Sequence, residues 1–363
     1  MKHRSRVYFV PVADGEPVDS VAQKTSRLAS AARLDSAVAL ERDCAIKTHF
    51  GEGHNTGFVK PEIVAAIVQF VEKAGGRPFV TDTNTLYRGR RHRAVDHLRQ
   101  AADHGFTLER IGAPVIIADG LLGADQVSVP IPAGKHFQQV RIASALHQAA
   151  AAIVLTHVKG HCQLGLGGSL KNVGMGCAAR AGKLAQHQGG QPSFNGRKCE
   201  ACGSCVSWCP TRAIRIEEHE GQRRAVVDPA LCVGCGECLA LCPSDAIEFS
   251  WSDEGGAIGE KVCEHVLGFH ETKPLGVGYI NMVTDLTRNC DCVGQKQRVE
   301  YPNVGVLASV DVVAVDQAAV DLSRKRLGKD IWSEWWPDAK FEAMLAYAES
   351  LGLGAREYDL VEV

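Results

Sequence analysis

The 363-residue chain contains no run of about eighteen or more apolar residues, so no membrane-spanning helix is expected. It also has little net charge: 40 basic residues stand against 42 acidic ones, for a formal charge of -2. That balance argues against nucleic acid or a membrane surface as a partner. The apolar segment at residues 7–12 is too short for the core of a signal peptide, and no cleavage site follows it. We therefore expect a cytoplasmic protein.

Cysteine, in contrast, is abundant. The chain has 14 cysteines, and eight of them lie between Cys199 and Cys242. A secreted chain of fewer than about a hundred residues would use such a set for disulfides. In a long chain without a signal peptide, we interpret the eight thiols as metal ligands.

Outside this block, helical and extended patterns alternate. Pro61 can begin a helix, apolar residues recur after it at helical spacing, and Gly75 ends it. The alternation predicts an α/β fold with a mostly parallel sheet and flanking helices. Further expected strands are 79–81, 115–118, 152–156 and 305–308, and further expected helices are 92–104, 140–151, 312–322 and 341–351.

The cysteine-rich segment interrupts this alternation. We expect residues 192–251 to form a small α+β domain inserted between two parts of one α/β domain, residues 1–191 and 252–363. The alternative is a linear arrangement, in which the C-terminal part is a unit of its own.

The cysteine block is an internal repeat. Cys199-x2-Cys202-x2-Cys205-x3-Cys209-Pro210 recurs 33 residues later as Cys232-x2-Cys235-x2-Cys238-x3-Cys242-Pro243. Three closely spaced thiolates can bind one cubane cluster, while the fourth cysteine reaches the other cluster. The predicted ligand sets are therefore Cys199, Cys202, Cys205 and Cys242 for one cluster, and Cys232, Cys235, Cys238 and Cys209 for the second.

This segment resembles the bacterial ferredoxin module with two [4Fe–4S] clusters, a match that covers all eight cysteines and both prolines. Residues 213–216 and 246–249 are expected to form short strands over the clusters. Zinc sites and a disulfide knot are the alternatives. Paired zinc sites would leave the third cysteine of each run unused.

A glycine-rich segment follows the buried strand at 152–156. It carries His157, Lys159, His161 and Lys171, and a second polar cluster with Lys47 and His49 follows an earlier apolar stretch. Ligands bind at the carboxyl ends of strands in α/β sheets, so these six residues are our candidates for a pocket that holds a small anion. Asp82, Thr83, Tyr87, Arg88 and Arg91 could line the same cleft. The alternative is a glycine turn needed for packing, with solvated lysines and histidines.

Six cysteines remain outside the repeat, and Cys290-Asp-Cys292 is the notable pair. Its two thiolates could bind a further metal or cluster with Cys177 or a histidine as an outside ligand. They could equally form a redox-active thiol pair or be incidental.

Together these segments resemble the iron–sulfur proteins that carry domain of unknown function 362. The resemblance implies an iron–sulfur protein and gives no catalytic residue. The matching motifs are Lys47-Thr-His-x-Gly-Glu52, Asp82-Thr83, Tyr87-x-Gly89-x-Arg91, His157-x-Lys-Gly-His161, Gly167-Gly168, Lys171-Asn172, Met175-Gly176-Cys177, Arg180-x-Gly-Lys183, His187, Asn289-Cys-Asp-Cys292, Leu307-Ala-Ser-x-Asp311 and Val315-Asp316-Gln-Ala318.

These observations favour a redox protein, leaning to an oxidoreductase or a subunit of one, that passes single electrons through two [4Fe–4S] clusters to a site in the α/β domain. The expected partner is a ferredoxin, a flavodoxin or a reductase, and the expected substrate is a small anion. One alternative is an electron carrier or docking subunit without an active site of its own. Another is a structural or oxygen-sensing iron–sulfur protein.

Overall fold

The computed structural model describes residues 4–38, 41–188, 192–219, 221–248 and 257–363. Its centre is an eight-stranded sheet with strand order β16-β1-β15-β14-β7-β2-β3-β4. All neighbours in this sheet run parallel except β15, which is antiparallel to both β1 and β14. The predicted α/β fold with a mostly parallel sheet and flanking helices is thus confirmed. The strands are β1 Ser5–Pro11, β2 Asp43–Lys47, β3 Arg77–Asp82, β4 Val115–Ile117, β7 Ala151–His157, β14 Val277–Val283, β15 Gly305–Ser309 and β16 Tyr358–Glu362.

The central strands are buried on both faces, as expected for parallel strands covered by helices. Along β7, Ile153 and Leu155 face one hydrophobic core while Ala152 and Val154 face the other, because successive side chains of a strand point to opposite faces. β7 lies before the cysteine-rich segment and its neighbour β14 lies after it, so both flanks of that segment contribute to one sheet.

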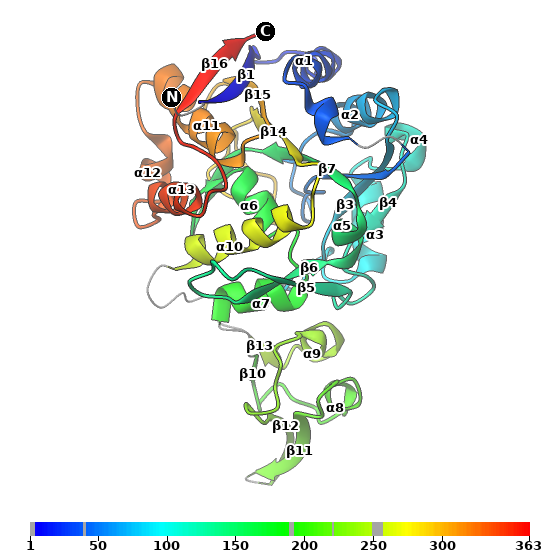
Figure 1. The fold of residues 1–363 in the computed structure, drawn as a ribbon. Coiled ribbons are helices and arrows are strands. Elements are labelled where there is room, and N and C mark those ends of the chain that lie inside the picture. The colour runs from blue at the N-terminus through cyan, green and yellow to red at the C-terminus, as the bar shows by residue number, and fades with distance from the viewer. Residues whose placement is uncertain (1–3, 39–40, 189–191, 220, 249–256) are drawn as a thin grey trace.

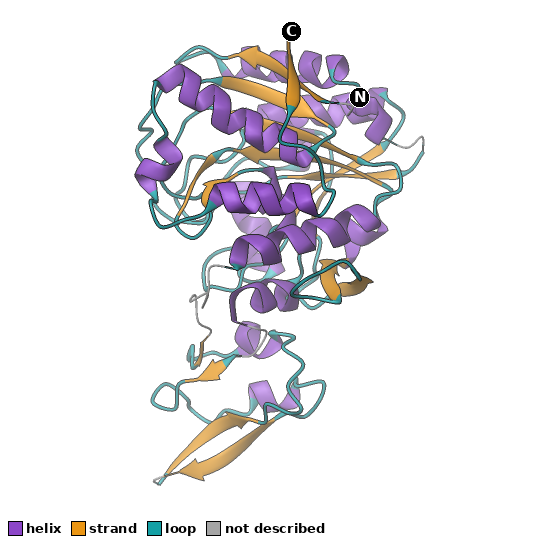
Figure 2. Ribbon diagram, turned by 60° about the vertical axis from the view of Figure 1, so that its left-hand side comes forward, coloured by secondary structure: helices purple, strands orange, loops and turns teal. Residues whose placement is uncertain are grey.

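Helices cover both faces of the sheet (Figures 1 and 2). One core contains residues of α1 Val18–Ala31, η1 Leu34–Ala37, α2 Pro61–Lys73, α3 Ala94–Asp103 and α4 Leu108–Ile111. The other contains residues of α5 Ser144–Gln148, α6 Ser169–Gly174, α10 Ile258–Glu271, α11 Val312–Leu327, α12 Ile331–Trp335 and α13 Phe341–Ser350. We call the sheet and these helices the sheet region. None of the described helices combines the length and the apolar character that crossing a membrane requires.

The expected helix over 140–151 is wrong. Gln139–Ala143 is strand β6, paired antiparallel with β5 Gln126–Pro130, and only Ser144–Gln148 is helical. Val140 and Ile142 are buried, whereas Gln139 and Arg141 are more exposed. This period of two favours a strand, and the prediction of a helix over 140–151 overlooked it. A further small hairpin is formed by β8 Lys159–His161 and β9 Gly165–Gly167.

The described residues of 192–248 form a smaller lobe, here called the cysteine module, which extends from the sheet region (Figure 1). Its two short helices each follow a glycine with positive φ, at Gly203 (76°) and Gly236 (72°), positions 33 residues apart. The two halves of the sequence repeat thus share a local structure. The elements are β10 Ser193–Phe194, α8 Ser204–Ser207, β11 Ile214–His219, β12 Gln222–Val227, α9 Glu237–Leu241 and β13 Ile247–Glu248. The proposed domain limits at 191 and 251, and Phe249 of the expected second strand, lie outside the described residues.

Candidate functional site

A cavity of about 500 Å³ opens at the carboxyl ends of the parallel strands. β2 ends at Lys47 and β3 at Asp82, and both residues line the cavity. This is the edge at which α/β sheets bind ligands. The lining is strongly basic: it contains Lys47, Arg91, Lys159, Lys171 and Lys183, three histidines, His49, His161 and His187, and a single carboxylate, Asp82.

Asp82 is the centre of a buried ion network. Its carboxylate lies 3.0 Å from Lys47 Nζ and accepts a hydrogen bond of 3.1 Å from Arg91 Nη1. Burial alone would raise the pKa of Asp82, but the charge of Lys47, with that of Arg91, holds it well below its usual value. Arg91 Nε also donates to Glu52 at 3.2 Å. Two of the five cations are therefore already paired.

Asp291 plays the same part for Lys159. Its carboxylate is fully buried, and it accepts hydrogen bonds from His157 Nδ1 at 3.0 Å and lies 3.0 Å from Lys159 Nζ. His157 Nε2 faces the carbonyls of Thr284 and Asp285 at 3.1 and 3.2 Å. Of the six pocket candidates, His157 alone is not in the cavity lining; it forms a hydrogen bond with Asp291 instead.

Lys171 and Lys183 have no carboxylate within 4.0 Å among the described residues. Lys183 Nζ instead donates to Thr83 Oγ1 at 2.7 Å, and burial lowers the pKa of Lys183 to about 8. Lys171 Nζ lies 3.2 Å from Cys290 Sγ. Burial would lower the pKa of Lys171, but Cys290 and Cys292 raise it above its ordinary value. Among the described lysines and arginines of the lining, these two are the ones without a carboxylate partner.

Three possible metal ligands meet beside Lys171. One ligand atom each of His161, Cys290 and Cys292 lies within 4.8 Å of the others. Burial lowers the pKa of His161 well below its usual value, and the positive charge of Lys171 is the second largest cause. The imidazole is therefore neutral and able to bind a metal. A hydrogen bond from Cys292 lowers the pKa of Cys290, and Lys171 and Lys159 favour its thiolate further.

Cys177, the other outside ligand considered for this pair, is not in that group. It is fully buried in a hydrophobic core of the sheet region, and burial raises the pKa of its thiol to about 11. The structure thus brings a histidine, rather than Cys177, to the Cys290–Cys292 pair.

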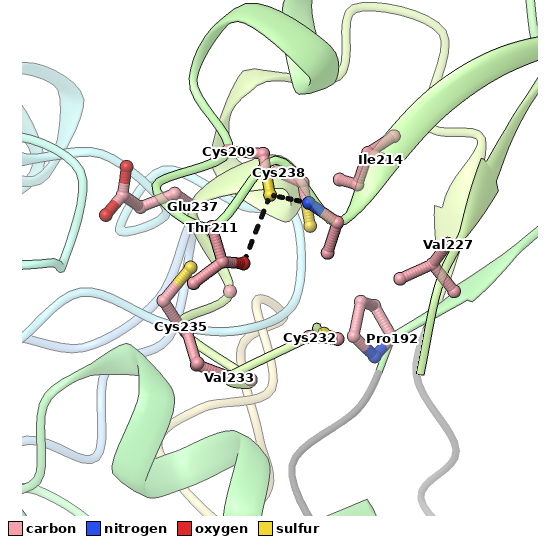
Figure 3. A pocket seen from close by; sticks show the side chains of 13 residues that line it. Pro192, Cys209, Thr211, Ile214, Val227, Cys232, Val233, Cys235, Glu237 and Cys238 are labelled. Carbon is pink, nitrogen blue, oxygen red and sulfur yellow. Dashed lines mark hydrogen bonds between the residues drawn. The ribbon is translucent and has the colours of Figure 1, made fainter. Parts of the chain in front are cut away.

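The cysteine module contains two small cavities, each lined by four cysteines. Cys209 lies with Cys232, Cys235 and Cys238 around one of them (Figure 3). The other is lined by the remaining four, Cys199, Cys202, Cys205 and Cys242. The fourth cysteine of each repeat therefore joins the other half. All eight are free thiols.

Backbone N–H groups point at several of these sulfur atoms. Ala213 N donates to Cys209 Sγ at 3.2 Å, and Ala246 N, 33 residues later, donates to Cys242 Sγ at the same distance. Hydrogen bonds to sulfur are a feature of iron–sulfur sites, where they tune the potential of the cluster. Together, the thiolate-only donor sets and these hydrogen bonds fit two cubane clusters.

The module and the large cavity share a wall. Leu86 lines the cavity and also packs in the module core with Cys205 and Cys238. Leu184 of α7 Arg180–Gln188 packs in the same core, while Lys183 and His187 of that helix line the cavity. Arg88 adds a hydrogen bond to the carbonyl of Cys242 and an ion pair with Asp245.

Sequence reasoning gave no role to Lys183, Asp291 or Leu86. Lys183 and His187 are four residues apart in a helix, a spacing that places both on one face and could have indicated a shared site. Asp291 was visible only as the residue between two cysteines, and nothing in the sequence marks Leu86.

The fold and the site together define an α/β protein with a basic cavity at its strand ends and a cysteine-rich module beside it. Residues 44–321 match the family described as a domain of unknown function, DUF362, and the chain belongs to this family. No curated protein shows significant sequence similarity to the chain.

Among solved structures, the chain is similar to the lactate racemase apoprotein from Thermoanaerobacterium thermosaccharolyticum, with a TM-score of 0.39 and 9% sequence identity. The match covers 78% of this chain and spans about half, 51%, of the racemase chain.

Proposed function

We propose that this protein is an iron–sulfur redox protein that transfers single electrons through two [4Fe–4S] clusters to a small anion bound in the basic cavity. The predicted ligand sets are the two groups of four cysteines that line the module cavities. The observation that carries the proposal is the position of Leu86, which touches the module core on one side and the cavity on the other.

Electrons would enter from a ferredoxin, a flavodoxin or a reductase. Clusters held by the two groups of four cysteines would supply one-electron chemistry beside the cavity. The chain's own residues bind and orient the anion: Lys171 and Lys183 supply charge, while Lys47 and Arg91 are held in place by Asp82.

The test is a reductive titration of anaerobically purified protein in the presence and absence of sulfate. We expect about eight irons and eight acid-labile sulfides per chain, for two clusters of four. Sulfate should lower the reduction potential of the clusters, because a nearby negative charge disfavours the more negative reduced state. Lys183→Gln should weaken this response, and Lys325→Gln, at an exposed position of α11, should leave it unchanged.

Two other results would contradict the proposal. Reversible reduction without any response to sulfate would indicate an electron carrier with no site of its own. Clusters that resist dithionite, while their loss unfolds the module, would indicate a structural role.

A further inference from the structure

The geometry of His161, Cys290 and Cys292 suits one metal ion. Their ligand atoms lie within 4.8 Å of one another. A tetrahedral ion with bonds of about 2.3 Å to sulfur holds its ligand atoms roughly 3.8 Å apart, so a small closure brings the three to bonding distance. A cubane would bind each thiolate to a different iron and would hold the two sulfur atoms farther apart.

The donor set indicates the kind of ion. Thiolate ligands select soft or borderline ions, and imidazole is a ligand that Zn²⁺ shares with thiolates. Structural zinc sites have four protein ligands, whereas three protein ligands leave one position open. His161 and Cys292 both line the large cavity, so the open position faces that cavity.

The loop that carries the two cysteines is held in place by hydrogen bonds. The carbonyl of Cys290 accepts from Gln297 Nε2 at 2.9 Å, and the carbonyl of Asp291 accepts from Glu52 N at 3.0 Å. The Asp291 carboxylate between the thiols is occupied by His157 and Lys159. These contacts hold the backbone of the loop that carries both sulfur atoms, as a rigid site requires.

We propose that His161, Cys290 and Cys292 bind one Zn²⁺ ion whose open position takes an oxygen atom of the anion held in the cavity. Lys171 donates a hydrogen bond to Cys290 Sγ at 3.2 Å and also lines the cavity in which the anion would lie. The substrate class is therefore a small oxyanion that can bind a metal ion. This inference deepens the proposed function, since it specifies how the same cavity holds its anion.

The test uses the full chain with its clusters in place, incubated with Zn²⁺ and then desalted. We expect about one zinc per chain in addition to the cluster iron, and zinc-edge X-ray absorption should show two sulfur atoms at about 2.3 Å and one imidazole nitrogen at about 2.0–2.1 Å. Cys290→Ser, Cys292→Ser and His161→Gln should each lose the zinc while iron and sulfide stay constant. Cys162→Ser is the matched control, because Cys162 also lines the cavity but is not in the ligand group.

The open position is tested with bromide, an anion heavy enough to be seen directly in the same spectrum. We expect a bromine neighbour of zinc in the wild-type chain, and its absence at saturating bromide would overturn the open position. Failure to retain zinc, zinc retained in all three ligand variants, or extra iron with matching sulfide would overturn the metal site. Since iron and sulfide are measured separately from zinc, each of these failures is distinguishable from failure of the two-cluster proposal.

Discussion

The sheet region and the cysteine module differ in how much apolar surface they bury. The sheet region buries dozens of apolar side chains in two cores, one on each face of the sheet. The module contributes six residues to its buried cluster, and two of them are cysteines, Cys205 and Cys238. So small a core contributes little stability, and domains of this kind rely on metal binding to fold. The comparison teaches that one part of the chain folds by burying apolar side chains, whereas the other has too few buried apolar side chains to rely on burial alone.

The largest expected effect comes from removing a thiol of the module. Cys209→Ala should lose about four of about eight irons, since a cubane needs its fourth ligand. Because Cys209 lines the cavity of the later cysteines, alkylation and mass spectrometry should find Cys232, Cys235 and Cys238 exposed and the Cys199, Cys202 and Cys205 set protected. Cys263→Ala, in buried α10 of the sheet region, should keep all the iron. Exposure of the earlier set instead would refute the crossed ligand sets.

The converse experiment creates a cavity in the hydrophobic core of the sheet region. Leu155→Ala on β7 removes a fully buried side chain and should lower the free energy of unfolding by about 2–5 kcal/mol. The measurement is urea unfolding followed by far-ultraviolet circular dichroism, with iron content measured in parallel. Iron per chain should stay constant below the transition; iron lost in native buffer would mean that the two regions do not fold separately.

A smaller effect is expected from pH at the cavity. Lys183 has a pKa of about 8, so its charge is present below pH 8 and is lost as the pH rises through that value. Sulfate affinity, measured by calorimetry, should fall over this range by roughly tenfold, the effect of losing one charge-assisted hydrogen bond of about 1.5 kcal/mol. Lys183→Gln should bind weakly with no such step, and a step of the same size in that variant would assign it to another group.

The smallest effect should come from the ion pair between the regions. Arg88 and Asp245 lie 3.0 Å apart and both are exposed, so Arg88→Ala should change stability by less than about 1 kcal/mol and leave iron content unchanged. Arg77→Ala, which breaks the exposed pair with Asp43 inside the sheet, is the control. Hydrogen exchange in the module is the more sensitive measurement. A large increase with Arg88→Ala would make this pair, rather than Leu86 and Leu184, the main contact between the two regions.

The features that the sequence predicted are those written in local patterns. The alternation of strands and helices predicted the fold class. The period-two pattern of Val140 and Ile142 was also local, but it was wrongly interpreted as part of a helix. Local spacing also gave the two groups of four cysteines, because the repeat is contained in one short segment. That they bind [4Fe–4S] clusters remains a prediction.

Long-range neighbours were the part that could not be predicted. His161 and Cys290 are far apart in the chain, and the pairing of β7 with β14 brings their loops together at one sheet edge. The sequence likewise did not show that His161, rather than Cys177, lies beside Cys290 and Cys292. This arrangement depends on which side chain faces the cavity and which faces the core.

Helix α7 has one face on the cavity, through Lys183 and His187, and another on the module, through Leu184. Because this helix borders both sites, binding of an anion in the cavity and reduction of a cluster are expected to affect each other reciprocally. Any factor by which a bound anion changes the equilibrium constant for reducing a cluster must equal the factor by which reduction changes the affinity for that anion. The protein with oxidised clusters would then bind its anion more tightly, and reduction of a cluster would lower its affinity for the anion.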